Sequence, residues 1–384
     1  MSAGAIRLSS VVLASPLRRD SPRPRDLRNA LYAAQYDWHT LFYDCYRSGR
    51  HVVLQGPPFF NLLAPLLQSA PLAALNRRWL GRPRHIGMCK RGEIWLRHDD
   101  DTLAIDGPIG RFAVPIQPDG AALFAGRRVI RTLSKDNAPR WIADWIAFYR
   151  AEHGADAALI YDNGSAAYDA AMLEAELAPR FPDMVIKVID WRFPYGPQGG
   201  MAGAVDGHET PWDSDFCQTG SLQHSWLRFL TGARAVLNVD IDELVLSPHG
   251  ESIFAATEAS AGGFVKFAGR WISGATAHGV APATCRHADF TLIDRDETRV
   301  CPPKWCVVPA RHDPRKASWS VHNLFGSRHN RQIDERFCYR HMTAISNGWK
   351  EDRAVTAGAD ADRFAADAAL TAAFARTGLA RTGG

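Results

Sequence analysis

Three carboxylates follow an apolar stretch in "AVLNVDIDELVL" (235–246), namely Asp240, Asp242 and Glu243. Such a cluster is repulsive and costly to desolvate, so it either lies in water at the end of a strand or holds a cation. Residues two apart in a strand point to the same side, so Asp240 and Asp242 are expected to converge on one spot. Converging carboxylates suit Mg²⁺ or Mn²⁺, which also bind phosphate oxygens. The spacing therefore predicts a metal site that binds a diphosphate.

The pattern around these acids alternates between strand and helix from residue 127 onward. Strands are expected at 127–134, 156–165, 183–190 and 234–240, and helices at 135–155, 166–177 and 216–230. In the first helix, Asn137 is the expected N-cap, Pro139 lies in the first turn and Gly154 ends the helix. This alternation is typical of a parallel α/β sheet covered by helices on both faces, which binds ligands at the carboxyl ends of its strands. The acids at 240–243 and the polar turn at 162–165 both fall at that edge.

Composition narrows the class of protein. The 384 residues are 46% hydrophobic and 22% charged with a net charge of +4, which indicates a globular protein and suits a small anionic substrate but not nucleic acid. Seven cysteines without a CxxC pair argue against a disulfide framework or a zinc site and favour the reducing cytoplasm. No stretch is typical of a membrane span, so at most peripheral contact with the inner face of the membrane is expected. The first 120 or so residues predict short strands and helical turns, and no chemistry.

Several motifs in order resemble one enzyme family. The segment "KDNAPRWIADWIAFYRAEHGADAALIYDNGS" (135–165) is similar to the opening of GT-A glycosyltransferases, in particular the family 92 and family 2-like bacterial enzymes. "DIDEL" (240–244), "GGFVKFAGRWISG" (262–274), "KWCVVP" (304–309), "VHNLF" (321–325) and "YRHMTAISNGWKEDR" (339–353) resemble later segments of that family. The chain departs from it with "KDN" in place of "KNE" and with Leu244 in place of Phe. The likeness covers about residues 127 to 352.

The resemblance implies a fold and a domain organisation. It implies an α/β, Rossmann-like GT-A domain at 126–353, with a mostly parallel sheet and helices on both faces. Residues 1–125 have no counterpart in that family, and their own pattern predicts an N-terminal accessory region, a mixed α/β extension with short strands. The alanine-rich pattern of residues 354–384 predicts a helical tail.

The resemblance also assigns roles to individual residues. The metal ligands would be Asp240, Asp242, His322 and His341, and Glu243 would tune the site. The donor-binding residues would be Lys135, Asp162, Asn163, Gln218, Asp240 and Lys304. The candidates for the catalytic base would be Asp294, Asp296 and Glu297. The glycine-rich loop 196–207, together with "HETPWDSD" (208–215), would be either a lid over the donor or a plain linker.

The implied activity is transfer of a sugar, with inversion, from a nucleotide-diphosphate sugar to a hydroxyl acceptor. The expected cofactor is Mn²⁺ or Mg²⁺, and the donor expected first is a UDP-sugar. The acceptor would be a glycan or a lipid-linked molecule, in the biosynthesis of surface or capsular glycans. Two alternatives stay open: a GT-A-like carbohydrate- or nucleotide-binding protein without turnover, and a Mg²⁺-dependent phosphohydrolase. A phosphohydrolase with a DxDx(T/V) motif fits less well because Leu244 occupies the last position. A nucleotidyltransferase would carry a glycine-rich first turn, which "LSKDNAP" lacks.

Overall fold

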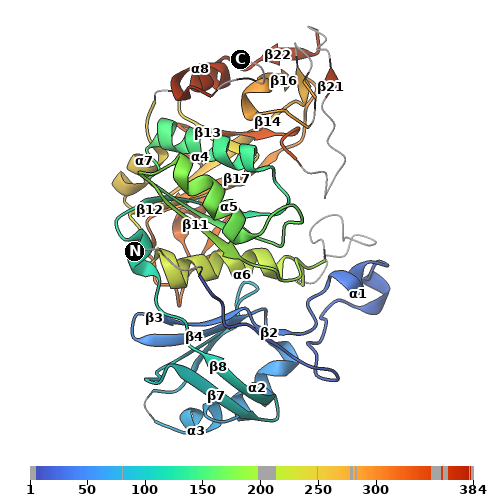
Figure 1. Cartoon of the computed structure of the whole chain (residues 1–384), viewed down its shortest axis with the longest axis vertical. Coiled ribbons are helices and arrows are strands. Elements are labelled where there is room, and N and C mark those ends of the chain that lie inside the picture. Colours follow the sequence, from blue (N-terminus) through green and yellow to red (C-terminus); the bar gives the residue numbers. More distant parts are fainter. Residues whose placement is uncertain are drawn as a thin grey trace. The chain divides into compact units, whose positions relative to one another are not determined.

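The chain forms two compact units. A computed structural model describes residues 6–79, 81–197, 213–248, 250–276, 280–281, 283–346, 356–357, 362–379 and 381. The first unit comprises residues 1–122, 191–231 and 318–320, and the second comprises 123–190, 232–317 and 321–384 (Figure 1). The helix expected at 216–230 therefore belongs to the same unit as the N-terminal residues. Residues 198–212 of the predicted lid at 196–215 lie outside the described residues.

An eight-stranded sheet organises the second unit. In spatial order its strands are β11 (Val185–Asp190), β10 (Ala157–Asp162), β9 (Arg128–Ser134), β12 (Ala235–Asn238), β17 (Cys301–Val307), β14 (Phe264–Ile272), β20 (Cys338–Met342) and β13 (Glu243–Leu246). The first four strands are mutually parallel, as are β14 and β20. Strand β17 is antiparallel to both of its neighbours, and β13 is antiparallel to β20. The predicted mixture of helices and strands is thus confirmed, but the sheet is mixed, and a mostly parallel sheet is not.

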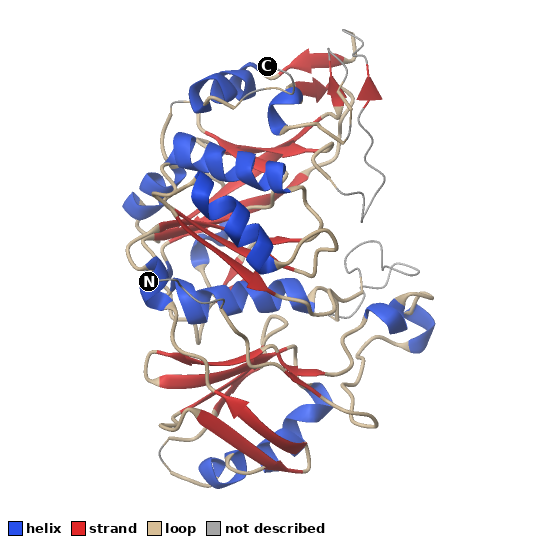
Figure 2. Cartoon of the chain, viewed as in Figure 1, coloured by secondary structure: helices blue, strands red, loops and turns tan. Residues whose placement is uncertain are grey.

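Helices pack on this sheet through one shared core. They are α4 (Pro139–His153), α5 (Ala170–Leu177), α7 (Ile253–Ala259) and α8 (Ala368–Thr377). Alternate residues of the strands, such as Ala158 and Ile160 of β10, share a buried cluster with apolar residues of all four helices. Figure 2 shows α4 and α5, which are in contact, lying along the sheet. The described helices of this unit share the core of one face, so helices on both faces are not confirmed.

The ends of the helices follow from local sequence. Pro139 begins α4, and Gly154 ends it with a left-handed φ of 70°, as predicted. The N-cap is Ala138, and the expected cap Asn137 instead donates from Nδ2 to Ser134 Oγ at 2.9 Å. Asp169 caps α5 by accepting a hydrogen bond from the Met172 amide. The prediction for Asn137 was wrong because the helix starts one residue later.

Short strand pairs complete the second unit. Strand β15 (Ala275–Thr276) pairs in parallel with β21 (Thr356–Ala357), and β16 (Leu292–Asp294) pairs antiparallel with β22 (Phe364–Ala366). Strand β19 spans Leu324–Phe325.

The first unit contains a separate antiparallel sheet. Its strands are, in spatial order, β3 (Asp44–Ser48), β4 (His51–Gly56), β6 (Gly92–Leu96) and β5 (Arg84–Ile86). Strands β7 (Thr102–Gly107) and β8 (Gly110–Pro115) form a hairpin, and β1 (Val11–Val12) pairs with β2 (Thr40–Phe42). Buried leucine, isoleucine and valine side chains from these strands and from α2 form its main core.

The remaining elements of the first unit are short. They include α1 (Tyr32–Gln35), α2 (Leu63–Gln68), α3 (Leu72–Asn76), α6 (Phe216–His224), the π-helical turn Ser225–Leu230 and β18 (Ser318–Trp319). Across the described part of the chain, no helix combines the length and the apolar character needed to cross a bilayer.

Candidate functional site

The site is built at one edge of the large sheet. The chain runs through β9, β10 and β11 in one direction across the sheet and then returns to place β12 on the other side of β9. In parallel α/β sheets, ligands bind outside the carboxyl ends of the strands at such a reversal. Because β17 and β13 run the opposite way, their first residues reach this same edge. Register pairs Asn238 with Trp305 and Glu243 with His341, which brings Lys304 and His341 toward the acids.

The acids lie in a turn between strands. Strand β12 ends at Asn238, β13 begins at Glu243, and the Glu243 amide donates to the Asp240 carbonyl at 3.1 Å. The Glu243 carboxylate accepts from the Asp240 amide at 2.8 Å and so closes the turn from the other side. The prediction that Asp240 and Asp242 share one face of a strand was wrong, because the strand stops two residues earlier. Each of the two aspartates has a different basic partner.

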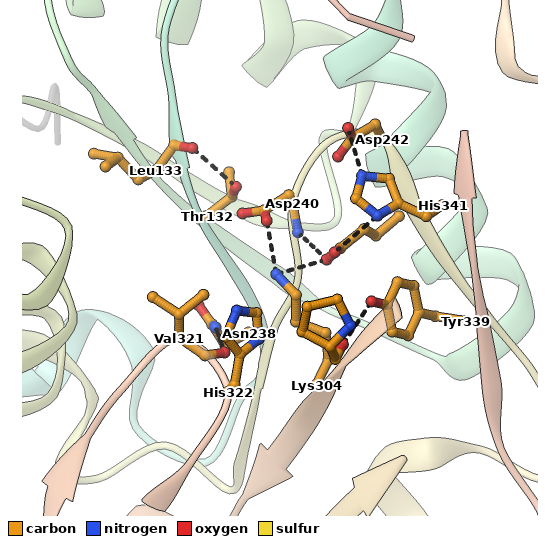
Figure 3. Close-up of polar contacts among 12 residues, drawn as sticks. Thr132, Leu133, Asn238, Asp240, Asp242, Lys304, Val321, His322, Tyr339 and His341 are labelled. Carbon is orange, nitrogen blue, oxygen red and sulfur yellow. Dashed lines mark hydrogen bonds and ion pairs between the residues drawn. The ribbon is translucent and has the colours of Figure 1, made fainter. Parts of the chain in front are cut away.

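Lys304 lies between two of the carboxylates. Its ammonium Nζ donates to Asp240 Oδ2 at 2.6 Å and lies 2.9 Å from Glu243 Oε2 (Figure 3). Lys304 and Glu243 are each 1% exposed, whereas the Asp240 side chain is 36% exposed. The acid with access to solvent is therefore Asp240, and the lysine and the glutamate lie beneath it.

Burial and charge oppose one another in this group. Burial raises the pKa of Glu243 to about 7 and outweighs the attraction of Lys304, which lowers it. Burial also lowers the pKa of Lys304, but the charges of Asp240 and Glu243 overcome this and hold it above its ordinary value. The lysine is therefore charged, and it stabilises carboxylates that are crowded by one another.

His341 is the partner of Asp242. Its Nε2 donates to Asp242 Oδ2 at 3.0 Å, and the ring stacks on Trp271 with centroids 4.1 Å apart. Burial lowers the pKa of His341, but the charge of Asp242 dominates and raises it to about 10. The Arg299 guanidinium lies over the same tryptophan ring, 4.7 Å from its centroid. Trp271 lies in the segment "GGFVKFAGRWISG" (262–274), but nothing in the sequence pattern indicated a role for it.

His322 has a different environment. It lies between β18 and β19, outside any strand, and its Nδ1 is 3.0 Å from the Pro303 carbonyl oxygen. Burial and the nearby charge of Lys304 lower the pKa of His322 to about 4, so the ring is neutral at ordinary pH. Figure 3 shows it on the Lys304 side of the site, whereas His341 lies on the Asp242 side.

The side chains as they lie do not fit a divalent cation. Among the described residues, no group of three or more histidine, cysteine, aspartate or glutamate side chains is arranged to hold a metal. The position between Asp240 and Glu243 holds the Lys304 ammonium, and Asp242 is bound to His341. Metal binding by Asp240, Asp242, His322 and His341 stays a prediction, and these contacts would have to change for it to occur.

The carboxyl ends of β9 and β10 are joined by a hydrogen-bonded turn. Asp162 is fully buried and accepts from the Ser165 hydroxyl and amide, and the Asp136 amide donates to Ser165 Oγ at 2.8 Å. Asn163 is buried, and Lys135 is exposed at the end of β9. The carboxylate of Asp162 thus shapes the turn, which positions Lys135 and Asn163 at the sheet edge. Donor binding by these residues stays a prediction.

Gln218 belongs to the first unit. It lies on α6, where its Oε1 accepts from the Tyr195 hydroxyl at 2.9 Å. Contact of Gln218 with the donor stays a prediction.

The three base candidates are surface acids near arginine. Asp294 lies on β16 and accepts from Arg363 Nη2 at 2.6 Å. Asp296 Oδ2 lies 4.0 Å from Nε of the same arginine. Glu297 is held by Arg299 through Nε and Nη2. The hydrogen bonds from these arginines lower the pKa of Asp294 and of Glu297. A general base works best with a pKa near the operating pH, so this environment does not favour either residue as the base.

The chain matches no model of a protein family and none of the curated proteins.

Proposed function

We propose that the chain is a glycosyltransferase of the GT-A type that moves a sugar from a nucleotide-diphosphate sugar to a hydroxyl group of a glycan or lipid-linked acceptor. In the inverting reaction, the acceptor oxygen forms a bond to the anomeric carbon as the bond to the diphosphate oxygen breaks. The diphosphate leaves with the electron pair, and the acceptor proton passes to a base.

The observation that carries the proposal is the position of the charged cluster. Strands β11, β10, β9 and β12 have the spatial order three, two, one, four of a doubly wound nucleotide-binding sheet. The crevice of such a sheet opens between its first and fourth strands. Lys135 follows one of these strands, β9, and Asp240 follows the other, β12. A partly exposed carboxylate at that point suits hydrogen bonds from ribose or sugar hydroxyl groups.

The nature of the base separates a glycosyltransferase from its main alternative, a protein that binds a nucleotide sugar without turnover. The surface acids Asp294 and Glu297 are held by arginine, which favours a protein that binds a nucleotide sugar without turning it over. The carboxylate of Asp240, open to solvent and next to the crevice, favours turnover because it could lie beside a reacting sugar. An experiment that measures binding and consumption together distinguishes the two.

Purified protein is incubated with UDP-, GDP-, ADP- and CDP-sugars, and release of each nucleoside diphosphate is measured by chromatography alongside thermal stabilisation. One sugar nucleotide is expected to stabilise the chain and to be consumed. Asp240→Asn is expected to slow consumption about thirtyfold or more, as for the loss of one partner of a charge pair. Asp183→Asn, a change at an exposed acid that pairs with Arg150, is the matched control.

Stabilisation without consumption would favour the binding protein. If no nucleotide sugar stabilises the chain or is consumed, the proposal is wrong.

A further inference from the structure

The acids of the site require positive charge, and the structure supplies it from the chain. Asp240 and Glu243 come within hydrogen-bonding distance of one ammonium group, at 2.6 and 2.9 Å from Lys304 Nζ. That position, next to the solvent-exposed aspartate, is where a divalent cation would bridge the carboxylates and a diphosphate.

We infer that Lys304 is a built-in cation that takes the place of a divalent metal, so that this site binds a nucleoside diphosphate without one. The inference rests on the proposed function, since it concerns how that donor site holds its ligand. It departs from the Mn²⁺ or Mg²⁺ dependence that the sequence resemblance implies.

The backbone fixes Lys304 in this position. Lys304 pairs with Phe267 of β14, and the residues that follow it, 305–307, pair with both β14 and β12. Lys304 therefore cannot leave the sheet edge without breaking the ladder to β14. Lys304 is 1% exposed, and its removal would leave the buried Glu243 without its closest cation. The lysine is therefore part of the folded sheet.

A metal ion bound to Asp240 would have to compete with this lysine. It would lie within a few ångströms of a charged ammonium, and like charges at that separation repel strongly at a poorly hydrated site. The metal would also have to share the Asp240 carboxylate with Nζ, which already donates to Oδ2. The same contact compensates the carboxylate, so that a diphosphate approaching the site meets less negative charge than three unpaired acids would present.

A second lysine of the sheet shows that this contact is specific. Lys266 lies on the adjacent strand β14 and is 8% exposed. Its ammonium donates to Asn323 Oδ1 at 2.7 Å and to the Asn330 carbonyl at 3.1 Å. Lys266 thus binds neutral oxygens, whereas Lys304 bridges two carboxylates. Lys266→Met is accordingly the matched control for Lys304→Met.

Isothermal titration calorimetry of the full chain tests the inference, with UDP, GDP, ADP and CDP as probes in EDTA and in MnCl₂. One diphosphate is expected to bind the unmodified chain with dissociation constants that agree within about threefold in the two buffers. Lys304→Met is expected to weaken binding in EDTA by about thirtyfold or more. Mn²⁺ is expected to restore part of the affinity in this variant, because the unneutralised acids then accept a cation. Lys266→Met is expected to leave the metal dependence unchanged.

The outcomes separate the inference from the proposed function. Binding to the unmodified chain that requires Mn²⁺ overturns the inference and leaves the proposed function intact. If Lys304→Met binds the diphosphate in EDTA as tightly as the unmodified chain does, the inference is also overturned. Absence of diphosphate binding in both buffers overturns both. If Lys304→Met fails to fold, Lys304→Arg keeps the charge and is expected to bind without metal, and the comparison of buffers on the unmodified chain still decides.

Discussion

The two units each bury an acid beside basic side chains, but they do so differently. In the first unit, Asp44 is fully buried and accepts four hydrogen bonds, from the Ser9 and Cys45 amides, His224 and Arg228. In the second unit, Glu243 is 1% exposed and shares the single Lys304 ammonium with Asp240.

The pKa values of the two acids move in opposite directions. Burial alone would raise the pKa of Asp44, but hydrogen bonding to His224 and the charge of Arg228 outweigh it and hold the pKa below the ordinary value. For Glu243, burial prevails over Lys304, and the pKa rises to about 7. The first cluster is arranged for stability. The second holds more acid than its lysine neutralises, which is typical of a site that binds a ligand.

The largest effect is expected from Asp44→Asn. The change removes a charge that four donors surround and leaves Arg228 buried without its carboxylate, which should cost about 4 kcal/mol of unfolding free energy. Chemical denaturation at pH 7 measures this. A loss below about 1 kcal/mol would contradict the structural role of the Asp44 cluster.

The same residue predicts a pH dependence. Because the pKa of Asp44 is lower in the folded state, its contribution is present above the unfolded pKa of about 3.9 and is lost as the pH falls through the folded value. The stability difference between the unmodified chain and Asp44→Asn is therefore expected to be constant from pH 7 to pH 5 and to shrink below about pH 4. A stability difference between the two chains that grows as the pH falls would contradict a lowered pKa of Asp44 in the folded state.

Lys304→Met is expected to have the next largest effect on stability, about 3 kcal/mol, because it leaves Glu243 buried beside Asp240 without the lysine. The double change Lys304→Met/Glu243→Gln should recover much of this loss, since it removes both members of the pair. Denaturation midpoints of the unmodified chain, the two single variants and the double variant give the double-mutant cycle. Additive losses would show that the lysine and the glutamate are not coupled.

Glu243→Gln alone is expected to change stability by less than about 1 kcal/mol. The amide keeps the shape of the side chain and removes a charge that is costly to bury, while Lys304 keeps Asp240 as its partner. Compared with Asp44→Asn, this is the same chemical change in the other cluster. Equal losses for the two variants would remove the distinction between the clusters.

The smallest effects are expected from Asp294→Asn and Glu297→Gln. Both acids form exposed pairs with arginine, and such pairs contribute about 0–1 kcal/mol. Consumption of the sugar nucleotide should stay within about twofold of the unmodified chain. A loss of consumption at unchanged stability would restore the residue concerned as the catalytic base.

The sequence predicted the order of elements better than the shape of the site. Strands β9 to β12 and helices α4 and α5 follow from apolar periodicity and from Pro139 and Gly154, which act within a few residues of chain. The antiparallel strand β17 depends on pairing between distant segments, which periodicity does not reveal.

The site illustrates the same limit at the level of side chains. The cluster of acids was visible in the sequence, and so was its need for a cation. The sequence could not show that β12 stops at Asn238, nor that β17 brings Lys304 between Asp240 and Glu243, because both depend on strand register. The stacking of Trp271 on His341 likewise depends on the parallel pairing of β14 with β20.

Hydrogen–deuterium exchange with the best-binding nucleoside diphosphate tests the central claim most directly, because it reports where on the chain the ligand binds. Amide exchange is expected to slow in peptides covering 132–138 and 236–246, at the ends of β9 and β12, and to stay unchanged at 44–56 in the sheet that contains Asp44. Protection confined to other peptides, or none at saturating ligand, would contradict a donor site at this edge of the sheet.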